Sequence, residues 1–148
     1  MKIIVSFAIL LVFLIAGCPS AEKKPTKATI PTAPFSLVGT EWLLADLAGT
    51  PVIANSKASL AFPEAGRVAG NGSCNRFTGS VTISGETLKF GALASTRMAC
   101  MDAGVSAQED AYLKALEAGN RYEYRDPKLL IYATGYDKPL QFTHSPAK

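Results

Sequence analysis

The sequence predicts an α+β domain, in which a mainly antiparallel β-sheet closes toward a barrel and one three-turn helix packs on it. Three observations lead to this prediction. Eleven of the twelve glycines lie between Gly39 and Gly135. Apolar runs in that region are short and are separated by turn residues, which is typical of antiparallel strands. One segment near residue 110 instead has the apolar spacing of a helix.

Seven short segments are predicted as strands because their apolar residues alternate, or because turn residues bound them. They lie at residues 40–47, 58–62, 77–83, 87–90, 121–125, 129–133 and 140–142. Ser84-Gly85-Glu86 predicts a hairpin turn, and Asp126-Pro127-Lys128 predicts another between the fifth and sixth segments. Seven or eight strands with such close turns favour a sheet or a barrel.

The predicted helix begins at Ser106, because Ser106 and Glu109 match the S-x-x-E capping box. Tyr112 and Leu116 belong to its apolar stripe. In this interpretation Glu109 is the capping partner. Asp110 follows it directly and points in another direction, so the two carboxylates do not form a catalytic pair.

Residues 1–17 have the features of an export signal. Lys2 precedes a nearly unbroken apolar run, which is shorter than the roughly 20 residues that a membrane-spanning helix needs. The run ends at Ile15-Ala16-Gly17-Cys18, which resembles a bacterial lipobox. An ordinary signal peptide with a chance cysteine and a short anchor helix are the alternatives. The cysteine stands where the apolar run ends, so we predict lipidation at Cys18.

Residues 18–35 carry four of the nine prolines and no glycine, a composition that favours an extended tether over a packed core. Residues 36–143 form the predicted folded domain, and residues 144–148 a flexible tail. Residue 19 is Pro rather than the Asp that resembles an inner-membrane retention signal. We therefore expect a lipid-anchored protein of the bacterial cell envelope, at the outer membrane and facing the periplasm.

The distribution of charge excludes some functions. Residues 35–148 hold eleven Lys or Arg and eleven Asp or Glu, so the net positive charge lies in front of the folded domain. Nucleic-acid binding needs a basic face, and it is not expected here. His144 is the one histidine of the sequence, which disfavours most histidine-based catalysis and a multi-histidine metal site. We predict no catalytic residues, no metal and no cofactor.

Two cysteines remain once Cys18 is assigned to lipid. Cys74 and Cys100 are an even pair in an exported domain, which favours a disulfide. Closing a loop of about 26 residues would stabilise the fold by roughly 3.5 kcal/mol. The alternatives are a cysteine nucleophile, for which only His144 is available as a base, and a zinc site, for which further ligands are lacking.

The segments around these cysteines resemble the META/HslJ family of small envelope domains. The matching segments are residues 70–79 (GNGSCNRFTG) and residues 95–100 (STRMAC), and the resemblance covers nearly all of residues 37–143. It implies an antiparallel, barrel-like fold with a helix, and it agrees with the heat-shock lipoproteins of that family. The resemblance implies no enzymatic reaction. It implies an association with envelope stress.

Asn75, Arg76, Thr96 and Arg97 are polar residues inside these segments, and two interpretations compete. In the first, the two guanidinium groups bind a carboxylate or phosphate beside the disulfide. In the second, Asn75 supports a turn, and the arginines bind loop carbonyls or pair with nearby acids. We favour the second, because arginines usually stay solvated or paired.

Three classes of function remain. The first is a non-enzymatic envelope lipoprotein that supports envelope integrity or stress tolerance through protein contacts. The second is a barrel that binds a small apolar ligand in the periplasm, and the third is an enzyme. An exposed apolar patch would favour the first, a roomy interior the second, and converging titratable groups the third. We rank them in that order, with the membrane and an envelope protein as the expected partners.

The lipidation prediction is tested by the intact mass of the protein extracted from membranes. We expect a chain that begins at Cys18 and carries added acyl mass, such as palmitate, because stable anchoring takes more than one acyl chain. An unmodified chain that begins elsewhere and is found in the soluble fraction would contradict the prediction.

Overall fold

The computed structural model describes residues 35–145. Cys18 and the predicted signal and tether segments up to residue 34 lie outside the described residues, as do residues 146–148. The elements in chain order are β1 Glu41–Leu47, β2 Thr50–Pro51, β3 Ser59–Ala61, β4 Arg67–Asn71, β5 Arg76–Ser84, β6 Thr87–Ser95, α1 Ala103–Glu117, β7 Gly119–Arg125, β8 Lys128–Ala133 and β9 Leu140–His144.

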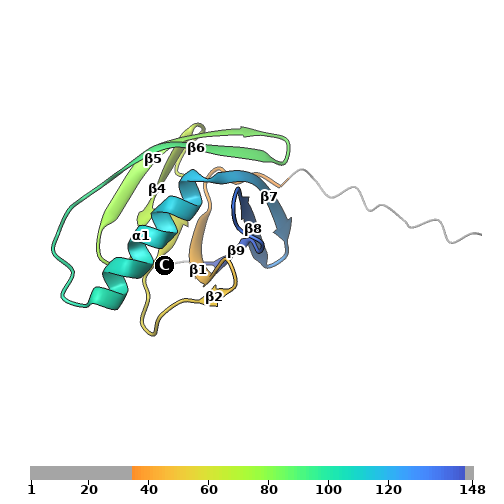
Figure 1. The fold of residues 1–148 in the computed structure, drawn as a ribbon. Helices are drawn as coiled ribbons and strands as arrows, with labels where there is room; N and C mark the ends of the chain where they lie inside the picture. Colours follow the sequence, from red (N-terminus) through yellow and green to blue (C-terminus); the bar gives the residue numbers. More distant parts are fainter. Residues whose placement is uncertain (1–34, 146–148) are drawn as a thin grey trace, which may run out of the picture. The chain divides into compact units, whose positions relative to one another are not determined.

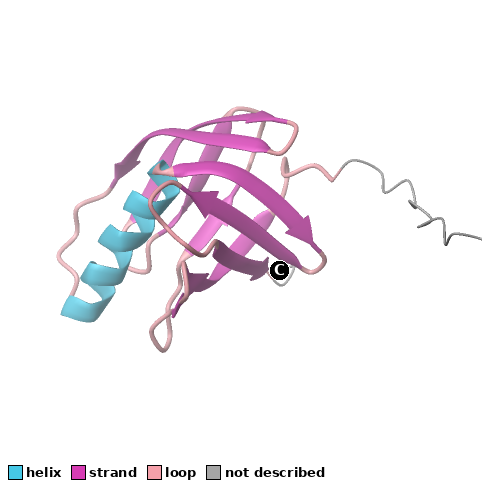
Figure 2. Cartoon of the chain, turned by 45° about the vertical axis from the view of Figure 1, so that its right-hand side comes forward, coloured by secondary structure: helices cyan, strands magenta, loops and turns pink. Residues whose placement is uncertain are grey.

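Eight of the strands close into a barrel. They pair antiparallel in the order β1-β3-β4-β5-β6-β7-β8-β9, and β9 pairs with β1 to complete the ring. The short β2 pairs with the end of β1. Figure 2 shows the strands curving round on themselves with the helix at one side. The predicted fold class, a mainly antiparallel sheet that closes toward a barrel with one helix packed on it, is confirmed.

Side chains fill the interior of the barrel. The fully buried large side chains are those of Trp42, Leu60, Phe62, Val68, Phe77, Leu88, Tyr112, Leu116, Leu129, Ile131, Leu140 and Phe142. Tyr112 comes from α1, and its ring lies 5.9 Å from that of Phe77 and 6.3 Å from that of Phe142, centroid to centroid. Its hydroxyl donates to the carbonyl oxygen of Ser59 at 3.1 Å. Burial raises the pKa of Tyr112 well above its usual value.

The helix begins earlier than the capping-box pattern predicts. Its N-cap is Asp102, whose side chain accepts a hydrogen bond from the Gly104 backbone at 2.7 Å. Ser106 therefore lies inside the helix, and the assignment of Glu109 as a capping partner is wrong. The 15 residues of α1 make about four turns instead of three. Figure 1 shows α1 crossing from the loop after β6 to the start of β7. No helix within residues 35–145 is long and apolar enough to cross a membrane.

Three further features differ from the predicted elements, and the first is the two-residue strand β2, which lies outside the predicted strands. The strand β4 was not predicted, because its sequence RVAGN has one large apolar residue, Val68. Gly70 in this strand lies so close to the Ser59 carbonyl and the Phe77 ring that a Cβ there would overlap both. At the other end, His144 belongs to β9 rather than to the predicted tail, and the Ser145 backbone N–H donates to the Glu41 carbonyl oxygen at 3.0 Å.

The packed interior predicts a large cost for shortening Leu60, which is fully buried in β3. We expect Leu60→Ala to lower the free energy of unfolding by about 2–5 kcal/mol, because it removes buried methyl groups and leaves a cavity. Urea denaturation followed by circular dichroism measures the change. Thr82→Ala, at an exposed position of β5, is the control and should cost under about 1 kcal/mol. Equal losses for the two variants would contradict a packed interior.

Candidate functional site

A disulfide joins the turn between β4 and β5 to the loop that precedes α1. The Cys74 and Cys100 Cα atoms lie 5.9 Å apart, within the usual range of about 4.4–6.8 Å for such bonds. The predicted disulfide is therefore confirmed. Together the turn and the loop form the candidate site, which we call the disulfide loop region (residues 71–76 and 95–102), and α1 packs beside it.

A buried carboxylate from α1 holds this turn in place. Glu109 is 5% exposed, and its Oε2 accepts hydrogen bonds from the backbone nitrogens of Cys74 at 3.1 Å and Asn75 at 2.7 Å. Its Oε1 accepts from the side-chain amide of Asn75 at 2.7 Å. A Cβ on Gly72 would overlap this carboxylate, so the glycine permits the close approach. Asp110, the next residue, is exposed, as its different direction on the helix predicts.

Asn75 connects the turn to the neighbouring loop. Its side-chain oxygen accepts from the Thr96 hydroxyl at 2.9 Å and from the Met98 backbone at 2.8 Å. The Thr96 hydroxyl in turn accepts from the Arg76 backbone at 3.2 Å. Asn75 is buried, and it uses both its amide group and its oxygen in structural hydrogen bonds. The hydrogen bonds of Asn75 and Thr96 therefore support the second interpretation, in which Asn75 has a structural role in the turn.

A second polar cluster fixes the same turn from the side of β3. The Gln108 side-chain oxygen accepts from the Ile53 backbone at 2.7 Å, and its amide donates to the Ser56 hydroxyl at 2.8 Å. The Ser56 and Ser73 hydroxyls lie 2.9 Å apart. Asn71 accepts from the Ser73 backbone at 2.7 Å, which supports the positive φ of Ser73. Of two adjacent helix residues, Glu109 therefore binds the turn itself, and Gln108 binds the loop between β2 and β3 that contacts the turn through Ser56.

The structural interpretation also predicts that Arg76 and Arg97 bind loop carbonyls or pair with nearby acids. For these two side chains the prediction is wrong. Arg76 and Arg97 are exposed, and their guanidinium groups have no hydrogen bond or ion pair with any described residue. Arg76 lines an open depression of about 560 Å³ that also contains Lys57, Glu41 and Asn71. These side chains present charge to solvent and do not hold the loops.

Two methionines of the same region are exposed to solvent. Met98 is 62% exposed and Met101 is fully exposed, and both flank Cys100. Among the described residues, the only other large hydrophobic side chain with such exposure is Val38. Two exposed apolar side chains therefore lie close in the chain to the exposed Arg97.

Comparisons with known proteins agree with this geometry. The model of the META domain family matches residues 35–147. The chain belongs to the META domain family. No curated protein matches it closely enough to be counted as a relative.

Solved structures show the same META domain fold. An NMR structure of a protein from Burkholderia xenovorans is similar, with 27% identity and a TM-score of 0.60, over 84% of this chain and 99% of that one. A crystal structure of a DUF4847 family protein from Bacteroides vulgatus ATCC 8482 has 14% identity and a TM-score of 0.55 over 76% of this chain and 96% of that one.

Among the described residues of this META domain, few side chains that could act in catalysis or metal binding lie close together. Within residues 35–145, no three His, Cys, Asp or Glu side chains are placed to hold a metal ion. Glu109 faces the amide of Asn75 rather than a second acid. The ring of His144 lies 4.3 Å from that of Trp42, centroid to centroid, at the end of β9.

Sequence reasoning missed the central residue of the site, Glu109, and its neighbour Gln108. Glu109 contacts Cys74 and Asn75, which lie 35 and 34 positions earlier in the chain. Gly72 lies within the recognisable cysteine segment, but only the structure shows that it makes room for the Glu109 carboxylate. The exposed methionines had a signal, since they are large apolar residues in a segment without strand or helix periodicity.

The buried carboxylate of this META domain predicts that Glu109→Gln is destabilising. Glutamine has an NH₂ group in place of one carboxylate oxygen. This donor would face either the backbone N–H groups of Cys74 and Asn75 or the side-chain amide of Asn75. We expect a loss of about 2 kcal/mol in the free energy of unfolding, the usual worth of a hydrogen bond to a charged group. Urea denaturation of the oxidised protein measures it. Asp110→Asn is the matched control on the same helix and should change stability by under about 0.5 kcal/mol. Indistinguishable midpoints would contradict the role given to Glu109.

Proposed function

We propose that this chain is a non-enzymatic envelope lipoprotein whose META domain binds another envelope protein through the disulfide loop region, and so supports envelope integrity or stress tolerance. The observation that carries the proposal is the exposure of Met98 and Met101 on a fixed loop. Flexible, polarisable methionines are common on surfaces that bind other proteins.

The fixed loop strengthens this argument. The disulfide at Cys100 and the hydrogen bonds from Thr96 and Met98 to Asn75 hold the loop at several points. A surface held in place before binding loses less conformational freedom when a partner docks. Arg97, the neighbour of Met98 in the chain, and Arg76 are both exposed, and their charged groups are available for an acidic partner.

The alternative, a barrel that binds a small apolar ligand in its interior, has less support. Large side chains, among them Trp42, Phe77, Tyr112 and Phe142, occupy the interior and are fully buried. A ligand-binding barrel needs an interior of several hundred Å³ that side chains leave empty. An enzymatic function also has little support, because the buried carboxylate is engaged in structural hydrogen bonds.

The proposal predicts that Met98→Ser and Met101→Ser each weaken the complex by about tenfold, since each removes apolar area that the partner buries. In cells, a photoreactive amino acid at position 98 or 101 of the full chain should give a crosslinked product of one defined mass. The same amino acid at position 82, an exposed site of β5, is the control and should not give that product.

A functional assay completes the test. A strain that lacks the protein should become sensitive to detergent, and the double variant Met98→Ser with Met101→Ser should fail to restore resistance although it forms the Cys74–Cys100 disulfide. Full restoration by that variant, together with crosslinking that does not differ between positions 98 and 82, would refute the proposed surface.

A further inference from the structure

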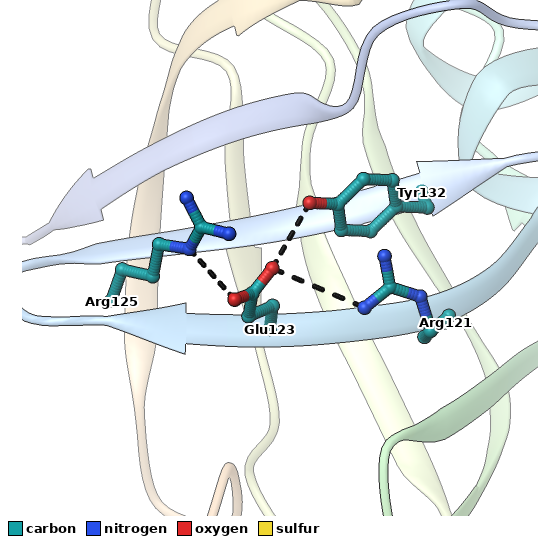
Figure 3. A network of polar contacts seen from close by, with 4 residues as sticks. All are labelled: Arg121, Glu123, Arg125 and Tyr132. Atoms are coloured by element: carbon teal, nitrogen blue, oxygen red, sulfur yellow. Dashed lines mark hydrogen bonds and ion pairs between the residues drawn. The ribbon is translucent and has the colours of Figure 1, made fainter. Parts of the chain in front are cut away.

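The outer face of β7 and β8 carries a network of charged and aromatic side chains, which Figure 3 shows from close by. Glu123 lies between Arg121 and Arg125, and its Oε1 accepts from the Arg125 Nε at 2.7 Å. Its Oε2 accepts from the Tyr132 hydroxyl at 3.0 Å and lies 4.0 Å from Arg121 Nη1. The Arg121 guanidinium carbon also lies 3.8 Å from the centroid of the Tyr132 ring. One carboxylate thus orients two arginines.

This arrangement leaves the outer end of Arg125 available. Hydrogen bonds from Arg125 and from Tyr132 lower the pKa of Glu123 below its usual value, so it is ionised at neutral pH and holds the Nε of Arg125. The two terminal nitrogens of Arg125 make no hydrogen bond with any described residue. They carry four N–H donors in one plane. A guanidinium group oriented in this way loses little freedom when it binds an anion.

A second cation lies opposite Arg125. Lys128 pairs with Arg125 across the β7–β8 hairpin, so both side chains are on the outer face of the sheet. Lys128 is exposed, and within residues 35–145 its ammonium group has no ion-pair partner. Glu123 is already shared between two arginines, so the positive charge of Lys128 is not balanced by this network.

The two cations border a depression with an apolar floor. It measures about 400 Å³ and is lined by Arg125, Lys128, Leu130, Tyr132, Pro139 and Gln141. Leu130 alternates with Leu129 and Ile131, which point into the core, so it faces outward and yet is only 8% exposed. Its burial on the outer face comes from the side chains around the depression. Charged walls above an apolar floor suit an amphipathic anion.

We propose that this depression binds a phosphate ester, with the phosphate group between Arg125 and Lys128 and the adjoining organic part over Leu130. A phosphate group presents oxygens on several sides, so it can accept from two cations that approach from different strands. A carboxylate presents two oxygens in one plane, which suits a single guanidinium group. Gln141 supplies a further amide at the edge of the depression.

Two sources of such a group fit the chemistry, a phospholipid headgroup and a soluble phosphate ester. Phe35, the first described residue, stacks on Tyr124 at a centroid distance of 3.8 Å. Tyr124 directly precedes Arg125 in β7. Phe35 therefore lies at the same end of the barrel as the depression. Titration with one compound of each kind separates the two sources.

The test uses the full chain, labelled with ¹⁵N, in micelles of dodecyl maltoside, a detergent without phosphate or charge. Glycerol 3-phosphate and short-chain phosphatidylglycerol are titrated separately, with glycerol and acetate as reference compounds. We expect saturable shifts of the amide signals of Leu130, Tyr132 and Gln141 with the phosphate compounds. Tighter binding of glycerol 3-phosphate indicates a soluble ester, and tighter binding of phosphatidylglycerol indicates a headgroup, and either supports the proposal.

Matched variants test the two cations. Lys128→Gln should weaken binding by about tenfold, the effect of losing one charge-assisted hydrogen bond. Lys89→Gln removes an exposed strand lysine of β6 and should leave binding unchanged. Arg125→Gln, whose fold is checked by its amide spectrum, should also weaken binding. The proposal is overturned by the absence of saturable shifts up to about 10 mM, by acetate binding as well as phosphate, or by equal effects at Lys128 and Lys89.

Discussion

The arrangement of the loops depends on one buried contact, the carboxylate of Glu109 against the turn between β4 and β5. Three N–H groups converge on it, and a turn of the helix by one residue, about 100°, would remove this acceptor. Gln108, which would replace it in one direction, has a single acceptor oxygen, and Asp110, in the other direction, has a side chain shorter by one methylene group. Apolar packing tolerates small shifts, whereas buried polar groups without partners cost about 1–3 kcal/mol each. The polar contact therefore fixes the position of α1 on the barrel.

The disulfide acts on the same turn by a different physical route. A crosslink between Cys74 and Cys100 restricts the unfolded chain, while the Glu109 contact favours the folded one. With both present, the segment from Thr96 to Cys100 is held to Asn75 by side-chain and backbone hydrogen bonds and to Cys74 by a covalent bond. The exposure of Met98 is then a property of the native loop rather than of a fluctuating one.

Short-range patterns predicted most of this fold, and long-range contacts account for what they missed. Alternation and turn residues located seven strands, and an even pair of cysteines in a chain expected to be exported predicted the disulfide. The strand β4 was missed because Gly70 stands where an apolar side chain would have continued the alternation. The structure requires glycine there, since a Cβ would overlap the Phe77 ring. The start of α1 was misplaced because Asp102 and Ser106 both suit an N-cap, and only the fold selects Asp102. The partners of Glu109 lie more than thirty residues away, which no local pattern reveals.

A filled barrel leaves the outer surface for binding. Tyr112 and other large side chains fill the interior, and both proposed binding surfaces therefore lie on the outer faces of strands and on loops. The disulfide loop region connects β4 to β5 and β6 to α1, whereas the residues that line the depression beside Arg125 come from β7, β8, β9 and the segment before β9. Figure 1 labels these elements. The two proposed surfaces share no lining residue and no hydrogen-bond partner, and substitutions at sites without shared partners usually have additive effects. A substitution in one proposed surface is therefore expected to leave the contacts of the other unchanged, which allows the two proposals to be tested separately.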